Sequence, residues 1–468
     1  MFFDARQVEN DTHFEVNICI VGGGAAGITL ARELVNSGLT TILLEAGGTG
    51  FDESTQEVYR GIVKSDILDS NYLQRSRARY FGGTTNLWGG HSVVINPNIF
   101  RSRAGLPGGE WPITEAELRP YYKRAADSLG VKKAVKNSFN SKVSAKLMPM
   151  ERYPVGKNER RFGTYYYDEI NRSNTKVLLN ASVTAINPNR SGKQIDNLTV
   201  QTLTGNKFFV RARIFVLAAG GIENAKLLLL PTKISESGTG NHYDLVGRRF
   251  TDHLFGRGKL METNPPWKTD GETFSVLTPQ LQDEFMLPEM GVIRRFNDLE
   301  KVTGNSIMSA MAGMSDGSTG VRISQLSYYI EVLPIAENRV MLGNQKDPFG
   351  NPRTELRFHA TKQIRNLYTA SVELFARITG QEGIGRVQLI ERKFGVGNHH
   401  MNTTPMSNDP SRGVVDSNSK VHGVSNLFVA GSSVFPSSGC GNPTFPLISL
   451  TYRLADHLKV SFKVGEFT

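Results

Sequence analysis

FEVNICIVGGGAAGITLARELVNSGLTTILLEAGG, residues 14–48, has the order of a βαβ unit. Residues 16–21 are a short apolar run typical of a buried parallel strand, and an Ala- and Leu-rich helical pattern follows it. The turn between them contains Gly22, Gly24 and Gly27 in the spacing G-x-G-x-x-G. A second apolar strand then ends in a carboxylate. This order of strand, glycine turn, helix and strand predicts a nucleotide-binding unit.

Each residue of this motif has a physical role in binding a dinucleotide. Gly22 permits a tight turn, Gly24 lets the backbone approach a pyrophosphate, and Gly27 allows the helix to pack closely on the strand. The N-terminus of the helix presents free N–H groups and a partial positive charge to that anion. Glu45, at the end of the second strand, is placed to hydrogen-bond a ribose diol, and its charge disfavours a 2′-phosphate. The alternative is a structural glycine turn in some other βαβ unit.

The length and charge of the chain narrow its class. Its 468 residues exceed the usual size of a single hydrophobic core, so we expect two interleaved domains. The formal net charge is +10 and the isoelectric point about 9.4, but the basic residues occur as scattered pairs such as Arg160-Arg161. A solvated basic surface is the expected explanation, and no nucleic-acid partner is predicted.

Cysteine usage and hydropathy favour the cytoplasm. The chain has two cysteines, Cys19 in the first strand and Cys440 in a glycine-flanked loop, so a disulfide framework is not expected. Residues 1–14 lack the basic and apolar regions of a signal peptide. No apolar run reaches the length of a membrane span. We therefore expect a cytoplasmic protein that does not span a membrane.

A second glycine-rich segment follows the βαβ unit at residues 79–91, RYFGGTTNLWGGH. Two glycine pairs bracket two hydroxyls and a tryptophan, which predicts an irregular loop with accessible backbone N–H groups. Such a loop could wrap a flat ring system and its phosphates. The alternative is a long surface loop.

The middle of the chain alternates between the nucleotide fold and other structure. A helix is expected over residues 109–130, because Thr114 and Glu117 form a capping box, and residues 131–160 are a basic, irregular flap. The nucleotide fold then resumes, with expected strands at 176–186, 197–203, 206–213 and 214–217 and a helix at 222–230.

Residues 255–395 have a different pattern, which predicts a second domain. The expected strands are 256–262, 291–296, 324–332 and 338–342, followed by a turn at 347–352 and a helix at 361–380. Strands in series that are covered by a helix are typical of an α+β cap domain on a sheet.

The last seventy or so residues carry the residues suited to catalysis. A buried strand is expected at 427–430, a tight turn follows, and a helix begins near Asn442. His399 and His400 precede this strand, and an imidazole beside a redox ring can take the proton of a substrate hydroxyl. Neighbouring side chains diverge, and no Cys/His/carboxylate spacing supports a zinc site, so no metal is predicted. A serine hydrolase is disfavoured because no G-x-S-x-G elbow occurs.

Taken together, these motifs resemble the glucose–methanol–choline (GMC) flavin oxidoreductases over nearly the whole chain. The similar segments are the opening stretch, YFGGTTNLWGG, FVLAAGGIENAKLLLL, VGRRFTDH, NRVMLGNQKDPFGNPR and DPSRGVVDSNSKVHGVSNLFVAGSSVFPSSGCGNPT. GGTTNLW and WPITEAELRPYY are most similar to the branch that contains pyranose oxidase and the fructose dehydrogenase large subunit. The fold implied is a Rossmann-like α/β FAD-binding domain interleaved with an α+β substrate-binding cap domain on an antiparallel sheet. We expect FAD-binding parts at 1–95, 171–254 and 399–468, a cap and lid excursion at 96–170, and a substrate-binding domain at 255–398.

The resemblance implies hydride transfer from the hydroxyl carbon of a sugar, polyol or glycoside to flavin N5 of FAD. His399 would be the general base, and Asn442 would hydrogen-bond the same substrate oxygen. Substrate contacts are also expected from His400, Trp88 and His91. The residues implied to bind FAD are Gly22, Gly24, Ala25, Ala26, Gly27, Glu45, Ala46, Gly82, Gly83, Thr84, Thr85, Asn86, Val183, Ala218, Gly431, Ser432, Asn442, Pro443 and Thr444.

Three positions depart from the family pattern. Asn402 replaces the glycine of H-x-x-G-T, Pro405 replaces an arginine, and Leu87 stands where some relatives attach FAD through a histidine. Leucine cannot form that link, so we expect non-covalent FAD. Two other functions stay open: a GMC-fold FAD enzyme without net alcohol oxidation, such as a lyase or a photochemical enzyme, and a degenerate flavin-binding subunit. The electron acceptor and the oligomeric state also stay open.

Overall fold

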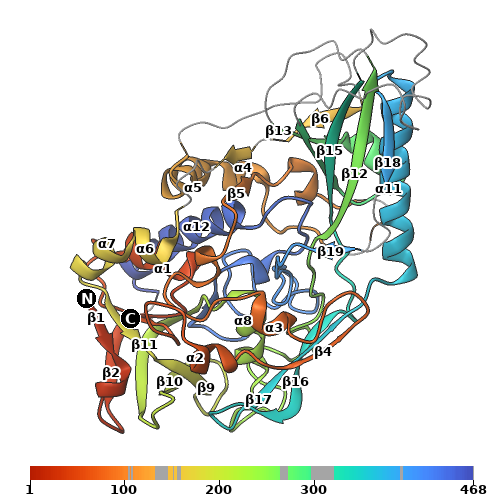
Figure 1. The fold of residues 1–468 in the computed structure, drawn as a ribbon. Coiled ribbons are helices and arrows are strands. Elements are labelled where there is room, and N and C mark those ends of the chain that lie inside the picture. The colour runs from red at the N-terminus through yellow and green to blue at the C-terminus, as the bar shows by residue number, and fades with distance from the viewer. Residues whose placement is uncertain are drawn as a thin grey trace.

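A computed structural model describes residues 1–103, 106, 109–131, 146–150, 152–154, 160–263, 272–296, 321–389 and 394–466. Its two main sheets are separate layers that are joined by the C-terminal segment of the chain (Figure 1). The predicted fold class, an α/β nucleotide fold combined with an α+β cap, is confirmed.

The nucleotide-binding part is an eight-stranded sheet. Its order is β1 (Phe2–Asp4), β8 (Lys176–Leu179), β3 (Thr41–Leu44), β2 (His13–Val21), β11 (Lys207–Leu217), β10 (Ile195–Gln201) and β9 (Ser182–Pro188), and β20 (Leu427–Val429) also pairs with β11. The pairs from β1 to β11 and the β11–β20 pair are parallel, whereas β10 pairs antiparallel with both β11 and β9. The helix α1 (Ala25–Leu34) connects β2 to β3, so the predicted βαβ unit is present.

Two strand predictions in this sheet were inaccurate. The expected strand 176–186 is divided into β8 and β9, because Asn180 turns the chain with a φ of +59°. The segments 206–213 and 214–217 instead form one long strand, β11, which pairs along β2 from Phe209 to Leu217. The helix α8 (Gly220–Leu229) follows β11 as expected.

The second sheet is entirely antiparallel. Its order is β18 (Arg386–Leu389), β12 (Leu254–Thr263), β15 (Val321–Ile330), β14 (Met290–Phe296), β13 (Glu272–Leu277) and β6 (Leu147–Pro149), and β19 (Gly395–Val396) also pairs with β12. The predicted long helix is α11 (Lys362–Gln381), capped by the side chain of Thr361. It runs alongside the sheet in Figure 1, and its buried Phe375 contacts the ring of Tyr328.

The expected strand 338–342 does not belong to this cap sheet. It is part of β16 (Arg339–Lys346), which forms a separate three-stranded sheet with β17 (Pro352–Phe358) and β4 (Ile62–Ser65). The turn between β16 and β17 is the predicted one, since Asp347 Oδ1 accepts hydrogen bonds from the N–H groups of Phe349 and Asn351, both at 3.0 Å. A tight turn returns the chain on itself, so β16 pairs with β17 and not with the cap strands.

The capping box of Thr114 and Glu117 is confirmed, but the helix expected over 109–130 is interrupted. It consists of α4 (Glu115–Leu118), the 3₁₀ turn η4 (Arg119–Tyr121) and α5 (Tyr122–Leu129). The break lies at Pro120, which has no N–H group for a helical hydrogen bond. Much of the expected flap at 131–160 lies outside the described residues, and the domain limits given above stay predictions.

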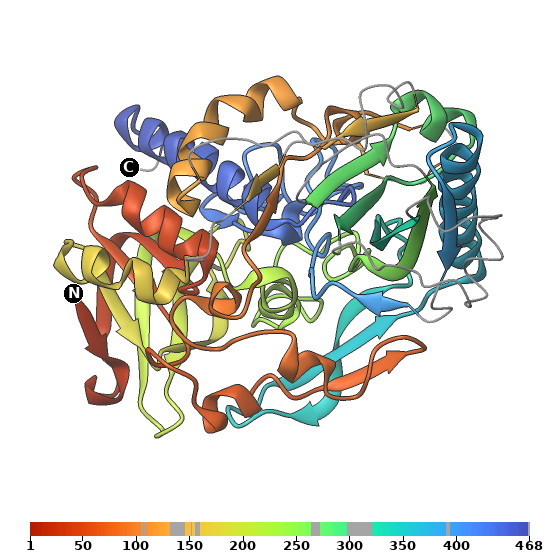
Figure 2. The same ribbon diagram turned by 45° about the horizontal axis from the view of Figure 1, so that its top comes forward.

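The C-terminal helix α12 (Thr444–Lys463) packs against α1 and α5, and its C-terminal end lies on the same side of the molecule as the N-terminus, away from the cap sheet (Figure 2). The remaining short elements are η1 (Ala5–Gln7), α2 (Glu53–Glu57), α3 (Tyr72–Arg75), η2 (Gly83–Asn86), β5 (His91–Val93), η3 (Pro97–Phe100), β7 (Arg152–Pro154), α6 (Phe162–Tyr165), α7 (Tyr167–Arg172), α9 (Pro279–Glu284) and η5 (Ser432–Val434).

Candidate active site

A cavity of about 670 Å³ extends from the nucleotide-binding sheet to the edge of the cap sheet. Its floor is formed where the parallel strands β2, β3, β11 and β20 end, at Val21, Leu44, Ala218 and Ala430. The carboxyl ends of parallel strands are the usual ligand-binding edge of such a sheet. Its far end is lined by Phe255 and residues of other cap elements.

The glycine turn fits the motif's predicted roles. Gly22 has a φ of +104°, and a Cβ on Gly27 would lie 1.8 Å from the carbonyl oxygen of Gly22, so a side chain at Gly27 would break the contact between α1 and β2. A Cβ on Gly24 would meet nothing within 4 Å. Gly24 lines the cavity, as do Ala25 and Ala26 at the start of α1. The turn is therefore open on its cavity side only, as a bound pyrophosphate requires.

Glu45 lines the cavity immediately after β3. Its Oε2 accepts a hydrogen bond from the N–H of Gly23 at 2.8 Å, and its Oε1 accepts one from the N–H of Gly47 at 2.9 Å. Burial raises the pKa of this carboxyl, and the two backbone donors oppose that rise. Ala46 and Val183 also line the cavity, and the ribose and adenine contacts expected of these residues stay predictions.

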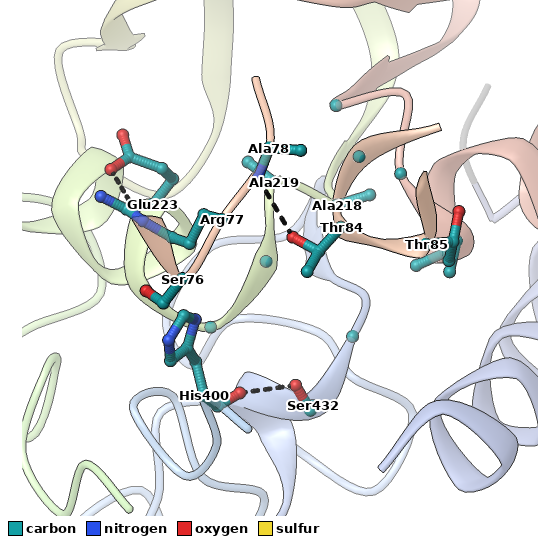
Figure 3. Close-up of a pocket in the computed structure, with 18 of the residues that line it drawn as sticks. Ser76, Arg77, Ala78, Thr84, Thr85, Ala218, Ala219, Glu223, His400 and Ser432 are labelled. Carbon is teal, nitrogen blue, oxygen red and sulfur yellow. Dashed lines mark hydrogen bonds and ion pairs between the residues drawn. The ribbon is translucent and has the colours of Figure 1, made fainter. Parts of the chain in front are cut away.

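Two arginines, Arg77 and Arg79, also line the cavity. The sequence motifs had not indicated them. Arg77 pairs with Glu223 at 2.7 Å, as Figure 3 shows, and its guanidinium lies 3.9 Å from the centre of the Tyr59 ring. Arg79 donates to Ser182 Oγ at 2.8 Å, while its Nε has no hydrogen-bond partner. The sequence SRARYF, in which arginines alternate just before the glycine pair, was the available signal.

The loop GGTTN packs directly on the first glycine turn. Gly82 and Gly83 have φ values of +97° and +52°, and a Cβ on Gly83 would lie 3.0 Å from the Cα of Gly24. Gly83, Thr84 and Thr85 line the cavity, and Thr84 Oγ1 accepts a hydrogen bond from the N–H of Ala78 (Figure 3). Asn86 points away, because its amide donates to the carbonyl of Phe81. Among the described residues, the cavity lining does not include Gly27, Gly82 or Asn86.

The C-terminal segment supplies the opposite wall. Gly431 turns the chain after β20 with a φ of +119°, and Ser432 Oγ donates to the carbonyl of His400 at 2.6 Å (Figure 3). Pro443 and Thr444 line the cavity where α12 begins. The N-terminal end of this helix therefore faces the cavity, as predicted.

The two predicted catalytic residues are in contact. The Nε2 atom of His399 lies 3.1 Å from Nδ2 of Asn442, and both residues line the cavity. Asp252, which is buried, holds the histidine loop: its Oδ1 accepts from the N–H groups of Gly397 and His399, and its Oδ2 from that of Asn398. Four hydrogen bonds to one carboxylate, the fourth from the Tyr72 hydroxyl at 2.6 Å, fix the position of His399.

His253 completes this cluster and was missed from the sequence. Its ring contacts both His399 and the carbonyl of Gly439 at 2.8 Å, and its side chain is fully buried. The segment VGRRFTDH ends with Asp252 and His253, directly before β12. That adjacency was the available signal, because a residue between the nucleotide fold and the cap sheet lies near the cavity between them.

The other predicted substrate residues are placed differently. His400 lines the cavity, but its Nε2 lies 3.1 Å from the Tyr72 hydroxyl, and burial lowers its pKa well below the usual range. Trp88 lines the cavity and donates from its indole N–H to the carbonyl of Arg160. His91 begins β5. The roles of these residues in substrate binding stay predictions.

The departures from the family motif are accommodated by the local structure. Asn402 has a φ of +69°, a left-handed conformation that suits glycine and is tolerated by asparagine. Its side chain accepts a hydrogen bond from Thr251 and donates to the carbonyl of Phe435 at 2.8 Å. The carbonyl of Pro405 accepts from the N–H of Val414 at 2.8 Å. The backbone that carries His399 is thus held without the missing glycine and arginine.

Other classes of site are not supported in the part of the chain that the structure describes. Cys19 and Cys440 are separate, buried thiols. No group of three or more His, Cys, Asp or Glu side chains among the described residues is placed to hold a metal ion. None of the described helices combines the length and apolar character needed to cross a membrane.

Comparison with known proteins identifies the class that this fold and site define. Two family models, both described as GMC oxidoreductase, match residues 109–255 and 334–451. The chain belongs to the GMC oxidoreductase family, whose members bind FAD and oxidise CH–OH groups. The family predicted from the sequence motifs is therefore confirmed.

Particular relatives span nearly the whole chain. The chain is 26% identical to the fructose dehydrogenase large subunit of Gluconobacter japonicus, over 98% of this chain and 100% of the relative. It is 24% identical to 6'''-hydroxyparomomycin C oxidase of Streptomyces lividus, over 94% and 92% of the two chains. Among solved structures, pyridoxine 4-oxidase from Mesorbium loti has a TM-score of 0.58 at 19% identity, covering 94% of this chain and 98% of that one. Formate oxidase from Aspergillus oryzae has a TM-score of 0.56 at 17% identity, covering 98% and 100%. These structures are similar in fold.

Proposed function

We propose that the protein is an FAD-dependent alcohol oxidoreductase that acts on a hydroxyl of a sugar, polyol or glycoside. The observation that carries this proposal is the contact of His399 with Asn442 in the same cavity as the glycine turn and Glu45. A base and a hydrogen-bond donor thus share a site with a cradle for a dinucleotide.

The residues that line the cavity suggest how FAD would be held along it. The adenosine and pyrophosphate half would be held by the glycine turn, the start of α1, Glu45, Ala46 and Val183. The flavin half would be held by Gly83 to Thr85 and by the turn and helix start at Gly431, Ser432 and 442–444. When bound, FAD would supply the two-electron acceptor for the hydride of the alcohol.

The protein's own contribution is to orient the alcohol and take its proton. His399 Nε2 accepts the hydroxyl proton, and the Asn442 amide donates a hydrogen bond to the same oxygen. As the O–H bond weakens, that donor stabilises the growing negative charge on oxygen. Holding the oxygen at two points also fixes the direction of the adjacent C–H bond, which lowers the entropic part of the barrier.

The substrate end of the cavity favours a ring with both apolar and hydroxyl-bearing faces. Phe255 and Tyr329 line it with their ring centres 5.1 Å apart, and Trp88 lies on the loop side. Aromatic rings pack well against the C–H faces of sugars, while Asn398, His399 and Asn442 offer polar contacts. Two of the relatives named above are, by name, enzymes of fructose and of an aminoglycoside, which supports the same substrate class.

Anaerobic reduction of the bound flavin tests the proposal. The protein is reconstituted with FAD, its flavin band near roughly 450 nm is recorded, and sugars, polyols, aminoglycosides and simple alcohols are added without oxygen. We expect bleaching of the band by at least one sugar-type alcohol. A flavoprotein that no alcohol bleaches would favour a lyase, a photochemical enzyme or a degenerate subunit, and a protein that binds no FAD would overturn the proposal.

A cytoplasmic location is also proposed. Cys19 and Cys440 are separate buried thiols, as expected in a reducing compartment. Fractionation of the native host, with antibody detection, tests this, and recovery outside the cytoplasmic fraction would contradict it.

A further inference from the structure

We propose that His253 is a positioning residue that fixes the tautomer of His399, so that Nε2 of His399 presents a lone pair to the substrate. This inference rests on the proposed function, because it concerns how the proposed base is prepared. It is carried by a chain of hydrogen bonds whose direction is set at both ends.

The first end of this chain is the carbonyl of Gly439. Its oxygen lies 2.8 Å from Nε2 of His253, and a carbonyl oxygen can only accept a hydrogen bond. Nε2 of His253 therefore carries a hydrogen. His253 is fully buried, and that burial lowers its pKa to about 3, so the ring is neutral and has one hydrogen only. Its Nδ1 must then be an acceptor.

The middle link follows from that assignment. Nδ1 of His253 lies 2.8 Å from Nδ1 of His399. Since the first of these atoms accepts, the second donates, and His399 carries its hydrogen on Nδ1. A neutral imidazole protonated on Nδ1 has its lone pair on Nε2.

The second end gives the same answer independently. Nε2 of His399 lies 3.1 Å from Nδ2 of Asn442, and an amide nitrogen only donates. This contact requires a lone pair on Nε2 of His399. The carbonyl at one end and the amide at the other are thus satisfied by a single arrangement of hydrogens.

The carbonyl that sets the direction is itself anchored to the cap side. The N–H of Gly439 donates to Oε1 of Glu331 at 3.3 Å, and the N–H of Cys440 donates to Oε2 of Glu289 at 2.9 Å. Glu331 is held in turn by a buried two-point ion pair with Arg103 at 2.6 and 2.8 Å. His253 therefore binds a fixed acceptor, which a mobile loop would not provide.

In the reaction, this arrangement of hydrogens affects only the transfer of the substrate's hydroxyl proton. When the substrate O–H bond breaks, its hydrogen forms a bond to Nε2 of His399, which becomes an imidazolium. The Nδ1–H group of His399 stays in place and donates more strongly to His253 Nδ1. His253 takes no proton, because its buried ring strongly disfavours a positive charge. It serves as the buried carboxylate does in a Ser-His-Asp triad, but with a neutral acceptor.

Nitrogen NMR of the holoenzyme tests the assignment directly. Protein labelled with ¹⁵N-histidine is reconstituted with FAD, and the His399 signals are identified by their loss in His399→Gln. We expect His399 to be protonated on Nδ1 and unprotonated on Nε2. A His399 protonated on Nε2 in the wild-type holoenzyme would overturn the proposal, whether or not any variant folds.

Variants then connect the tautomer to the rate. His253→Phe removes the acceptor, so we expect the Nε2–H form of His399 to grow and anaerobic flavin reduction to slow by about 10²-fold or more. His253→Asn places an amide oxygen near the position of Nδ1. It should restore part of the Nδ1–H form of His399 and part of the rate of flavin reduction. His13→Gln, at the exposed start of β2, is the control and should change neither.

The outcomes separate this inference from the proposed function. An unchanged tautomer and rate in His253→Phe would overturn the positioning role alone. The expected tautomer in a holoenzyme that no alcohol reduces would support the assignment of hydrogens while contradicting alcohol oxidation.

Discussion

His399 and Asn442 are 43 positions apart in the chain, yet Nε2 of the first lies 3.1 Å from Nδ2 of the second. The histidine follows the cap strand β19, and the asparagine precedes α12 of the nucleotide-binding part. The contact therefore lies at the junction of the two sheets, where the cavity reaches the cap. Several measurable consequences depend on it.

The first prediction concerns His399, the proposed base. His399→Gln removes the lone pair at Nε2, so we expect kcat/KM for the best alcohol to fall by about 10²- to 10⁴-fold. The content of bound FAD should stay at the wild-type value, because the glycine turn and Glu45 are untouched. Stopped-flow reduction of the flavin under nitrogen measures the rate. A variant that reduces its flavin as fast as the wild type would refute the assignment of His399.

The second prediction concerns Asn442, the proposed hydrogen-bond donor to the substrate oxygen. Asn442→Ala removes the amide that stabilises charge on the substrate oxygen, and a loss on the order of 10²-fold in the rate of flavin reduction is expected. Asn442→His, which keeps a nitrogen donor, should lose less. Equal losses in the alanine and histidine variants would show that the residue acts through packing and not as a donor.

A third prediction uses the two glycines of the βαβ turn as a matched pair. A Cβ on Gly27 would lie 1.8 Å from the Gly22 carbonyl, whereas a Cβ on Gly24 would meet no protein atom within 4 Å. Gly27→Ala should therefore lower both the melting temperature of the FAD-free protein and its affinity for FAD. Gly24→Ala should leave that melting temperature unchanged and weaken FAD binding alone. Calorimetry of the FAD-free protein and titration with FAD measure both, and full FAD affinity in Gly24→Ala would argue against a pyrophosphate at this turn.

A fourth prediction concerns acid stability. His253 is buried and His400 is half-buried, and loss of hydration lowers the pKa of His253 to about 3 and that of His400 well below the usual range. A histidine in the unfolded state titrates at about pH 6.5, so below that pH the unfolded state binds protons that the native state does not. Each such residue should lower the free energy of unfolding by about 1.4 kcal/mol per pH unit as the pH falls below about 6.5, and for His253 this continues to about pH 3.

His400→Gln isolates one of these two residues. Its amide can still donate to the Tyr72 hydroxyl, but it binds no proton. Urea unfolding of wild type and variant between about pH 7 and 5 measures the free energy of unfolding at each pH. Its decrease with falling pH should be smaller in the variant, because the variant takes up roughly one proton fewer on unfolding. Parallel curves for the two proteins would contradict the prediction.

A fifth prediction concerns the link to the cofactor. Leu87 lines the cavity as a residue that is 56% exposed, and its side chain has no atom that can attach to a flavin. Denaturation of the holoenzyme in acid should release all of its FAD into the supernatant, where absorbance measures it. Flavin that stays with the precipitated protein would contradict non-covalent binding.

Local patterns predicted much of this fold. The βαβ unit, the capping box at Thr114, and the helix that Thr361 caps depend on neighbours in the sequence, and each is present. The strand 338–342 was expected at the right place but in the wrong sheet. Its partner is set by the tight turn at Asp347 and by β4, which lies far away in the chain, and hydropathy does not encode such pairing.

The candidate site likewise combines residues that short segments indicate with residues that only distant segments bring together. Motif spacing indicated the glycine turn, and the resemblance to the family implied His399 and Asn442, because each belongs to a short recognisable segment. His253, Asp252 and Tyr72 join the cluster only through contacts between distant segments, such as the hydrogen bond from Tyr72 to Asp252 across 180 positions. The loop 397–399 owes its shape to the buried carboxylate of Asp252, and no periodicity in the sequence reveals those contacts.

The most direct test of the account is anaerobic reduction of bound FAD in wild type and His399→Gln with the same sugar-type alcohol. We predict that the wild-type band near roughly 450 nm is bleached, and that the variant binds FAD equally well but is bleached about 10²-fold or more slowly. Equal rates in the two proteins, or a wild-type flavin that no alcohol bleaches, would contradict the account.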